Sequence, residues 1–153
     1  MFAGTADCIT PFQDAVHYYD RIIDQCGGVA EAQQFFRFFV VPGLSHLNGS
    51  EGPSVIGQNL GDAHPVDSQH DLLSALVAWT EQNQAPEEIV ATGFKNLRDP
   101  SQGIEAQRPL YPYPLFPHCV EGEASDPGSF KPVEHARGKV PVPTDRYLQS
   151  RTQ

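Results

Sequence analysis

The chain has 153 residues, 39% of them hydrophobic, which is enough for one domain with a buried core. Its formal net charge of -9 excludes a nucleic-acid-binding protein, because binding to phosphates requires a basic surface. No apolar stretch reaches the roughly 18–20 residues of a membrane span, and the first residues lack the basic and apolar segments of a signal peptide. We therefore expect neither nucleic acid nor membrane as a partner.

The first predicted element is a helix that ends at two glycines. Thr10 is its candidate N-cap, with Pro11 at the first helical position and Gln13 three residues after the cap. Gly27 and Gly28 supply the C-terminal cap. Between the caps, apolar residues recur at the spacing of one helical face: Phe12, Val16, Tyr19, Ile23 and Cys26. The pattern predicts an amphipathic helix that buries this face.

A short apolar run follows, from Phe35 to Val41, interrupted only by Arg37 and ended by Pro42 and Gly43. A run of this length, rich in aromatic and β-branched residues, is typical of a strand covered on both faces. A helix that leads into a buried strand predicts a parallel partner strand before the helix. We expect that partner to end just before Gly4.

Residues 47–67 are rich in glycine and predict an irregular loop. Residues 68–84 predict a second helix, with Ser68 as cap and with Asp71 in the first turn. Ala85 and Pro86 end it, and residues 88–92 predict a last short strand. The expected buried side of this helix consists of its large apolar residues: Leu72, Leu73, Leu76, Val77 and Trp79.

Residues 108–117 hold four prolines among aromatic and aliphatic residues. Proline lacks a backbone N–H, so this density argues against a helix or a central strand and for an irregular, extended segment. We interpret it as a strap that covers apolar surface; the alternative is a proline-rich ligand for an aromatic-groove module. Residues 1–122 form the expected folded unit, and residues 123–153 a loosely structured tail.

Two side chains are candidates for catalysis: Asp7, in the turn before the first helix, and His46, in the turn after the predicted strand. Successive parallel strands end at the same edge of a sheet, so both turns are expected at that edge. A carboxylate can orient an imidazole, which then takes a proton from a serine hydroxyl and returns it to the leaving group. The alternative is that Asp7 caps a turn and His46 is a surface residue.

The residues around this pair resemble the acid and histidine loops of the tannase and feruloyl esterase family. The resemblance is carried by Gly4-Thr5-Ala6-Asp7 with Ile9-Thr10-Pro11, by Val41-Pro42-Gly43-Leu44-Ser45-His46, and by residues 71–79, 85–89 and 108–114. It implies an α/β fold, namely the C-terminal part of an α/β-hydrolase: a parallel sheet edge with two helices, followed by the proline-rich segment. It also implies a Ser-Asp-His triad, secretion, and ester substrates of phenolic acids or related carboxylic acids.

The sequence departs from that family in three places. No Gly-x-Ser-x-Gly motif occurs, Leu47 stands where a cysteine usually follows the histidine, and Tyr111 stands where a cysteine is common. The resemblance therefore implies a nucleophile elsewhere, so that the isolated chain is inactive or nearly so. The alternative is a degenerate hydrolase remnant that acts as a binding or interaction module. The exposed sheet edge separates the two: a truncated hydrolase is expected to self-associate through it, whereas a true module is expected to be a well-behaved monomer.

The remaining reactive residues predict no second site. Cys8 is expected to pack or bridge, since an adjacent aspartate opposes thiolate formation; Cys26 is expected in the core, and a bridge from Cys26 to Cys119 stays open. Ser45 is a poor nucleophile candidate, because neighbours on a turn point apart. The other histidines lack metal-ligand spacing and are expected at the surface: His17, His64, His70, His118 and His135. No cofactor or metal is expected.

Overall fold

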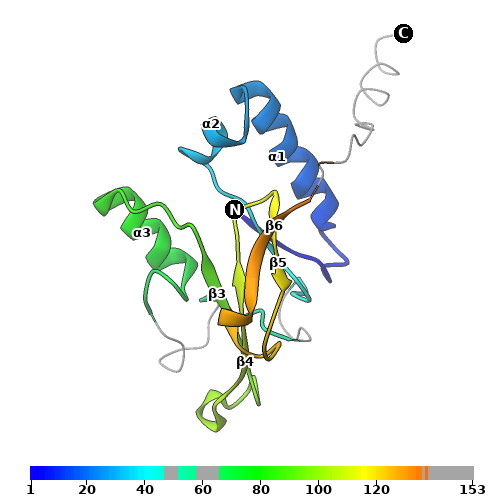
Figure 1. Cartoon of the computed structure of the whole chain (residues 1–153), viewed down its shortest axis with the longest axis vertical. Coiled ribbons are helices and arrows are strands. Elements are labelled where there is room, and N and C mark those ends of the chain that lie inside the picture. Colours follow the sequence, from blue (N-terminus) through cyan, green and yellow to red (C-terminus); the bar gives the residue numbers. More distant parts are fainter. Residues whose placement is uncertain (47–51, 58–65, 136, 138–153) are drawn as a thin grey trace.

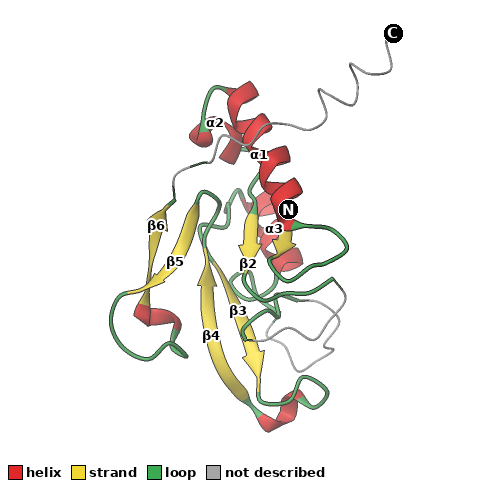
Figure 2. Ribbon diagram, turned by 90° about the vertical axis from the view of Figure 1, so that its right-hand side faces the viewer, coloured by secondary structure: helices red, strands yellow, loops and turns green. Residues whose placement is uncertain are grey.

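A computed structural model describes residues 1–46, 52–57, 66–135 and 137, and within them the chain forms three α-helices, two short 3-10 helices (Pro100–Gln102 and Pro127–Ser129) and six strands. The elements follow one another as β1 (Phe2–Gly4), α1 (Phe12–Cys26), α2 (Val29–Gln33), β2 (Phe39–Val41), α3 (Leu72–Gln82), β3 (Ile89–Phe94), β4 (Ile104–Leu110), β5 (Leu115–Cys119) and β6 (Phe130–Glu134). The β3–β4 ribbon and the α1–α2 pair lie toward opposite ends of the longest axis (Figures 1 and 2).

The described strands pair two by two: β1 with β2, β3 with β4, and β5 with β6. Only β1 and β2 are parallel, joined by the crossover through α1 and α2, and Gly4 lies opposite Val41. The predicted strand from Phe35 to Val41 was too long, since only Phe39–Val41 form a strand and Phe35 is 64% exposed. Because β1 offers only three residues for pairing, the ladder begins at Phe39.

Helix α1 buries the predicted face but begins differently from the prediction. Tyr19 and Ile23 are buried, and Gly27 ends the helix in the left-handed conformation, with φ of 88°. Pro11, not Thr10, occupies the N-cap position, and no side chain caps the helix. The Thr10 hydroxyl donates to the carboxylate of Asp7 instead. As an N-cap this hydroxyl would accept a hydrogen bond from a backbone N–H of the helix; here it serves as the donor to a carboxylate.

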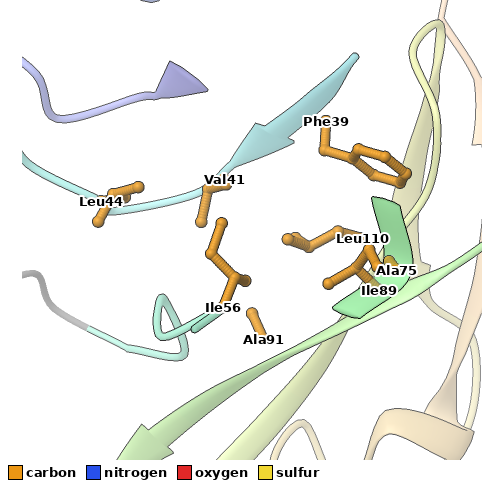
Figure 3. Close-up of a cluster of buried hydrophobic side chains, with 8 residues drawn as sticks. All are labelled: Phe39, Val41, Leu44, Ile56, Ala75, Ile89, Ala91 and Leu110. Atoms are coloured by element: carbon orange, nitrogen blue, oxygen red, sulfur yellow. The ribbon is translucent and has the colours of Figure 1, made fainter. Parts of the chain in front are cut away.

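Strand β2 separates two apolar clusters, because successive side chains of a strand point to opposite faces. Phe38 and Val40 pack with α1, α2 and Tyr113. Phe39 and Val41 face the other way, into a cluster that Figure 3 shows between β2, α3 and β3. That second cluster comprises Phe39, Val41, Leu44, Ile56, Ala75, Ile89, Ala91 and Leu110. The strand is therefore covered on both faces, as its composition indicates.

The proline-rich segment is more regular than the sequence suggests. Pro109 lies in β4, Pro117 lies in β5, and the supposed tail contributes β6, whose Pro132 faces Pro117. Among the described residues each of these strands has a ladder partner on one side only, which leaves an edge where a missing N–H disrupts no ladder. The prediction of irregular structure was therefore wrong for these strands. Residues 138–153 lie outside the described part of the chain.

The centre of the segment does act as a strap. The N–H of Tyr113 donates to the carbonyl of Phe38 at 2.7 Å, and Pro112 forms a bridge with Phe39. Tyr113 is 5% exposed, and its ring lies 5.8 Å from that of Phe38 and 6.1 Å from that of Tyr19. The aromatic side chain thus covers the junction of α1 and β2.

Helix α3 exposes most of the side that was expected to be buried. Leu73, Leu76 and Val77 are 69%, 51% and 41% exposed, while Ala75 and Ala78 face the core. The prediction was wrong for these three residues, because it ranked residues by hydrophobicity. Leu72 and Trp79 are half-buried, and Leu72 packs against the core cluster. Asp71, not Ser68, caps the helix: its carboxylate accepts from the N–H of Ser74 at 2.6 Å.

Other expectations concern the loop and the cysteines. Only parts of residues 47–67 are described, and there Val55 forms a bridge with Thr92 of β3. Cys8, Cys26 and Cys119 are all free, so no bridge joins Cys26 to Cys119. Cys8 was predicted to pack or to form a bridge, and this was wrong, because Cys8 is free and exposed. Within the described residues, no helix has the length and apolar content to span a membrane.

Candidate active site

The turns that follow β1 and β2 lie against each other at the ends of the two parallel strands. The N–H of Thr5 donates to the carbonyl of Val41, and the N–H of Ala6 to that of Leu44, both at 3.1 Å. Gly4 allows this approach, because a Cβ on it would overlap the Leu44 carbonyl. The backbone therefore fixes the distance between the turn that carries Asp7 and the turn that carries His46.

Asp7 and His46 meet at this junction. Nδ1 of His46 lies 2.9 Å from Oδ2 of Asp7, within hydrogen-bond distance. The Asp7 side chain is 10% exposed and that of His46 is 37% exposed. The imidazole thus rests on a nearly covered carboxylate while part of the ring stays accessible. Two residues that are 39 positions apart in the sequence are brought together as predicted.

The carboxylate of Asp7 has three further donors. Oδ1 accepts from the N–H groups of Ile9 and Thr10, each at 2.9 Å, and Oδ2 accepts from the Thr10 hydroxyl at 2.6 Å. The Thr10 hydroxyl and N–H hold the pKa of Asp7 well below its ordinary range, with a smaller contribution from the hydrogen bond to His46. Asp7 is therefore a permanent anion near neutral pH.

An open cavity of about 490 Å³ lies in front of the pair. Asp7, His46 and Thr10 line it, and Asp14 of α1 adds a second carboxylate. The rest of the lining is largely apolar: Phe2, Ala3, Ile9, Pro11, Ala15 and Leu44. A hydrophobic pocket with a few convergent polar groups is the usual form of a small-molecule site.

The geometry supports acid–base chemistry. An imidazole whose Nδ1 faces a carboxylate can accept a proton at its other nitrogen and become a stabilised imidazolium. Ser45 is half-buried beside His46 and also lines the cavity. The described residues contain no group of His, Cys, Asp and Glu side chains that could hold a metal ion.

The other candidates do not join this site. His70 pairs with Asp67 at 2.9 Å, three residues away on the approach to α3. His118 and His135 belong to the β5–β6 region, and His17 lies on α1. His64 lies outside the described residues.

Sequence reasoning missed one member of the site, Thr10. Its position one residue before a proline made it a helix cap in the prediction, whereas its hydroxyl and its N–H both bind Asp7. The signal that could have identified it is the Asp-x-x-Thr spacing, since an aspartate often accepts hydrogen bonds from residues two and three positions further along a turn.

Comparisons with known proteins agree on one family. Residues 1–133 match the family described as tannase and feruloyl esterase. An uncharacterized esterase of Xanthomonas campestris pv. campestris is 36% identical over 151 residues, which cover 90% of this chain and 26% of the relative. Feruloyl esterase B of Aspergillus niger is 31% identical over 131 residues, covering 84% of this chain and 24% of the relative.

Solved structures give the same result. The crystal structure of feruloyl esterase B from Aspergillus oryzae matches with a TM-score of 0.77 and 27% identity, covering 86% of this chain and 26% of that one. An esterase from the same fungus matches with a TM-score of 0.78 and 26% identity. The chain spans about a quarter of the length of the relatives that it matches.

Proposed function

The chain belongs to the tannase and feruloyl esterase family, and we propose that Asp7 and His46 are the acid and the base of a serine-esterase triad. The observation that carries this proposal is the 2.9 Å contact between Nδ1 of His46 and Oδ2 of Asp7 at the end of two parallel strands. The chain would then be the C-terminal part of an α/β-hydrolase, with carboxylic esters as substrates.

In the proposed reaction, His46 takes the proton of a serine hydroxyl as that oxygen attacks the ester carbonyl. It then returns the proton to the departing alcohol, which leaves an acyl-enzyme, and activates a water molecule to hydrolyse that intermediate. Asp7 keeps the imidazole oriented and stabilises its positive charge in both steps. The apolar lining of the cavity suits the aromatic acid of a phenolic ester, the substrate class that relatives' names include.

The serine is proposed to come from a part of the hydrolase outside these 153 residues, which hold no Gly-x-Ser-x-Gly motif. About three quarters of each relative lies outside the match. A surface suited to that part exists: a second cavity of about 340 Å³, lined by Phe2 of β1 and by Leu73, Leu76 and Trp79 of α3. Covering it would bury the exposed face of α3. Without such a part, the isolated chain is expected to be inactive.

A second candidate function rests on the same exposed surface. Leu73, Leu76 and Val77 form an apolar stripe on α3 beside the first residues of the chain. Apolar surface of this kind favours protein association, and β1 has a ladder partner on only one side among the described strands. A non-catalytic interaction module, or self-association, would use this stripe.

A chimaera tests the esterase proposal. We would replace the matched part of the Xanthomonas esterase with residues 1–133 of this chain and measure hydrolysis of methyl ferulate and p-nitrophenyl butyrate. The proposal expects hydrolysis that His46→Ala lowers by about a thousandfold or more. The matched control is His70→Ala, which breaks another histidine–aspartate pair of 2.9 Å and leaves the rate unchanged. Equal losses in both variants would reject the assignment.

A further inference from the structure

Three polar atoms meet within a small volume at the junction of the two turns. Oγ1 of Thr10 lies 2.6 Å from Oδ2 of Asp7 and 3.4 Å from Nδ1 of His46. The same Oδ2 lies 2.9 Å from Nδ1. A threonine has one hydroxyl proton and two lone pairs, and an ionised carboxylate oxygen can only accept. These numbers restrict where each proton can be.

The shorter of the two contacts of the Thr10 hydroxyl, the one to Asp7, shows where the hydroxyl proton lies. At 2.6 Å from a carboxylate oxygen, Oγ1 of Thr10 donates its only proton to Oδ2. Toward His46 it can then offer only a lone pair. Nδ1 of His46 is consequently faced by two acceptors, Oδ2 of Asp7 and Oγ1 of Thr10. A ring nitrogen without a proton would meet two lone pairs there, so the arrangement requires the proton on Nδ1.

We propose that Thr10 is a positioning residue for this pair: its hydroxyl holds Oδ2 of Asp7 in place and, as a second acceptor, selects the tautomer of His46 with the proton on Nδ1. The inference rests on the proposed function, since only in that tautomer is the lone pair of Nε2 available to take a proton from a nucleophile. Thr10 itself does not touch the reacting atoms.

Two further observations separate the role of the hydroxyl from that of the backbone. Oδ1 of Asp7 is held independently by the N–H groups of Ile9 and Thr10. Removing the hydroxyl therefore leaves the carboxylate anchored at Oδ1 and frees only Oδ2. The Thr10 hydroxyl is also the largest of the influences that lower the pKa of Asp7. Asp14 of α1 is the other carboxylate that lines the cavity.

Nuclear magnetic resonance of the full 153-residue chain, with ¹⁵N-labelled histidine, tests the inference. Long-range ¹H–¹⁵N spectra near pH 8.5, above the ordinary titration range of histidine, report which ring nitrogen carries the proton. The wild-type protein is expected to show His46 with the proton on Nδ1. Thr10→Val should give a mixture of tautomers and an Nδ1–H proton that exchanges with water about tenfold faster, the effect of losing one ordinary hydrogen bond. Thr10→Ser should restore both.

Matched variants make the outcomes distinct. Thr80→Val removes a hydroxyl that donates to the carbonyls of Leu76 and Val77 within α3 and does not line the cavity, and it should leave the tautomer unchanged. Three results would each overturn the inference: a wild-type His46 with the proton on Nε2, a Thr10→Val spectrum like that of the wild type, or an equal effect of Thr80→Val. If Thr10→Val fails to fold, Thr10→Ala replaces it, and a wild-type His46 with the proton on Nε2 would still overturn the inference.

Asp7→Asn separates this inference from the proposed function. If Asp7→Asn changes the tautomer and Thr10→Val does not, the role of Thr10 is wrong while the pair of Asp7 and His46 stands. If neither variant changes the tautomer of His46, the pair itself is wrong, because neither Asp7 nor Thr10 then determines which ring nitrogen carries the proton.

Discussion

Asp7 is the residue on which the proposed chemistry depends, and its two carboxylate oxygens have four hydrogen-bond partners. The backbone N–H groups of Ile9 and Thr10 hold one oxygen, while the Thr10 hydroxyl and His46 share the other. Such a carboxylate is oriented before any substrate arrives, which is the condition for efficient acid–base catalysis. The same hydrogen bonds link the protonation of Asp7 to the stability of the fold.

The first prediction concerns acid pH. The pKa of Asp7 is lower in the folded chain than the ordinary value of about 3.9 that applies to the unfolded chain. Its contribution to stability is therefore fully present above about pH 5 and is lost as the pH falls through its folded pKa. Urea unfolding at several pH values should show that Asp7→Asn is less stable than the wild type at pH 6, with the difference shrinking below pH 4. A constant difference would contradict this linkage.

A second prediction concerns Tyr19, which is fully buried and donates from its hydroxyl to the carbonyl of Phe36 at 2.6 Å. Burial raises the pKa of Tyr19 to about 12. Tyr19→Phe leaves the Phe36 carbonyl without this donor and should lower the free energy of unfolding by about 1–2 kcal/mol. The matched control is Tyr18→Phe, because Tyr18 is 48% exposed. Equal effects of the two substitutions in urea unfolding would show that this hydrogen bond contributes little.

Between single residues and the whole chain, the two turns after β1 and β2 act as one element. They are joined by the backbone hydrogen bonds of Thr5 and Ala6 and by the N–H of Gly43, which donates to the Thr5 hydroxyl. The short parallel ladder alone could not hold two side chains at fixed positions, since it spans three residues on each strand. The contact between the turns supplies the missing rigidity.

A third prediction tests that contact through Gly4. The Cβ of an alanine there would overlap the Leu44 carbonyl, so Gly4→Ala must push the histidine turn away from the acid turn. We expect a loss of about 1–3 kcal/mol in the free energy of unfolding, as for other overpacked sites. We also expect the hydrogen-bonded Nδ1–H signal of His46 to disappear from the proton spectrum. An unchanged signal in a folded Gly4→Ala protein would mean that the turns do not set the distance between Asp7 and His46.

Sequence reasoning succeeded where the structure is determined locally. The apolar face of α1, the glycines after it, and the positions of Asp7 and His46 at the ends of successive strands follow from short patterns. It failed where pairing between distant segments decides the outcome. Pro109 and Pro117 argue against central strands, yet both lie in strands that have a ladder partner on one side only among the described residues. For Thr10 the prediction failed within a local pattern, because it followed the Thr-Pro pattern of a helix start and not the Asp-x-x-Thr spacing of the turn in which Thr10 donates to Asp7.

On the scale of the whole molecule, the surface is uneven in polarity. The formal net charge is -9, yet α3 presents Leu73, Leu76 and Val77 to solvent beside the β1 strand. Charge of one sign keeps molecules apart, whereas an apolar stripe draws them together. The balance between the two depends on ionic strength, because salt screens the repulsion between like-charged molecules.

A fourth prediction follows from this balance. The chain should self-associate in a concentration-dependent way, and more strongly in 0.5 M than in 0.05 M salt, where the Debye length is several times longer. Replacing Leu73 and Leu76 with Gln should lower the association at least severalfold. The control is the double change Ile104→Gln and Val120→Gln, which removes two apolar side chains, 45% and 51% exposed, from outside α3. Light scattering that finds a monomer under all conditions, or equal effects of both changes, would contradict a role for the α3 stripe.

The central claim, that Asp7 and His46 act as one catalytic unit, is tested most directly by a double-mutant cycle in the active chimaera. Ester hydrolysis would be measured for Asp7→Asn, His46→Ala and the double variant. Residues that act as a unit are strongly non-additive, so the double variant should be no slower than His46→Ala alone. If the two losses instead multiply, Asp7 and His46 work independently, and the account of this site is wrong.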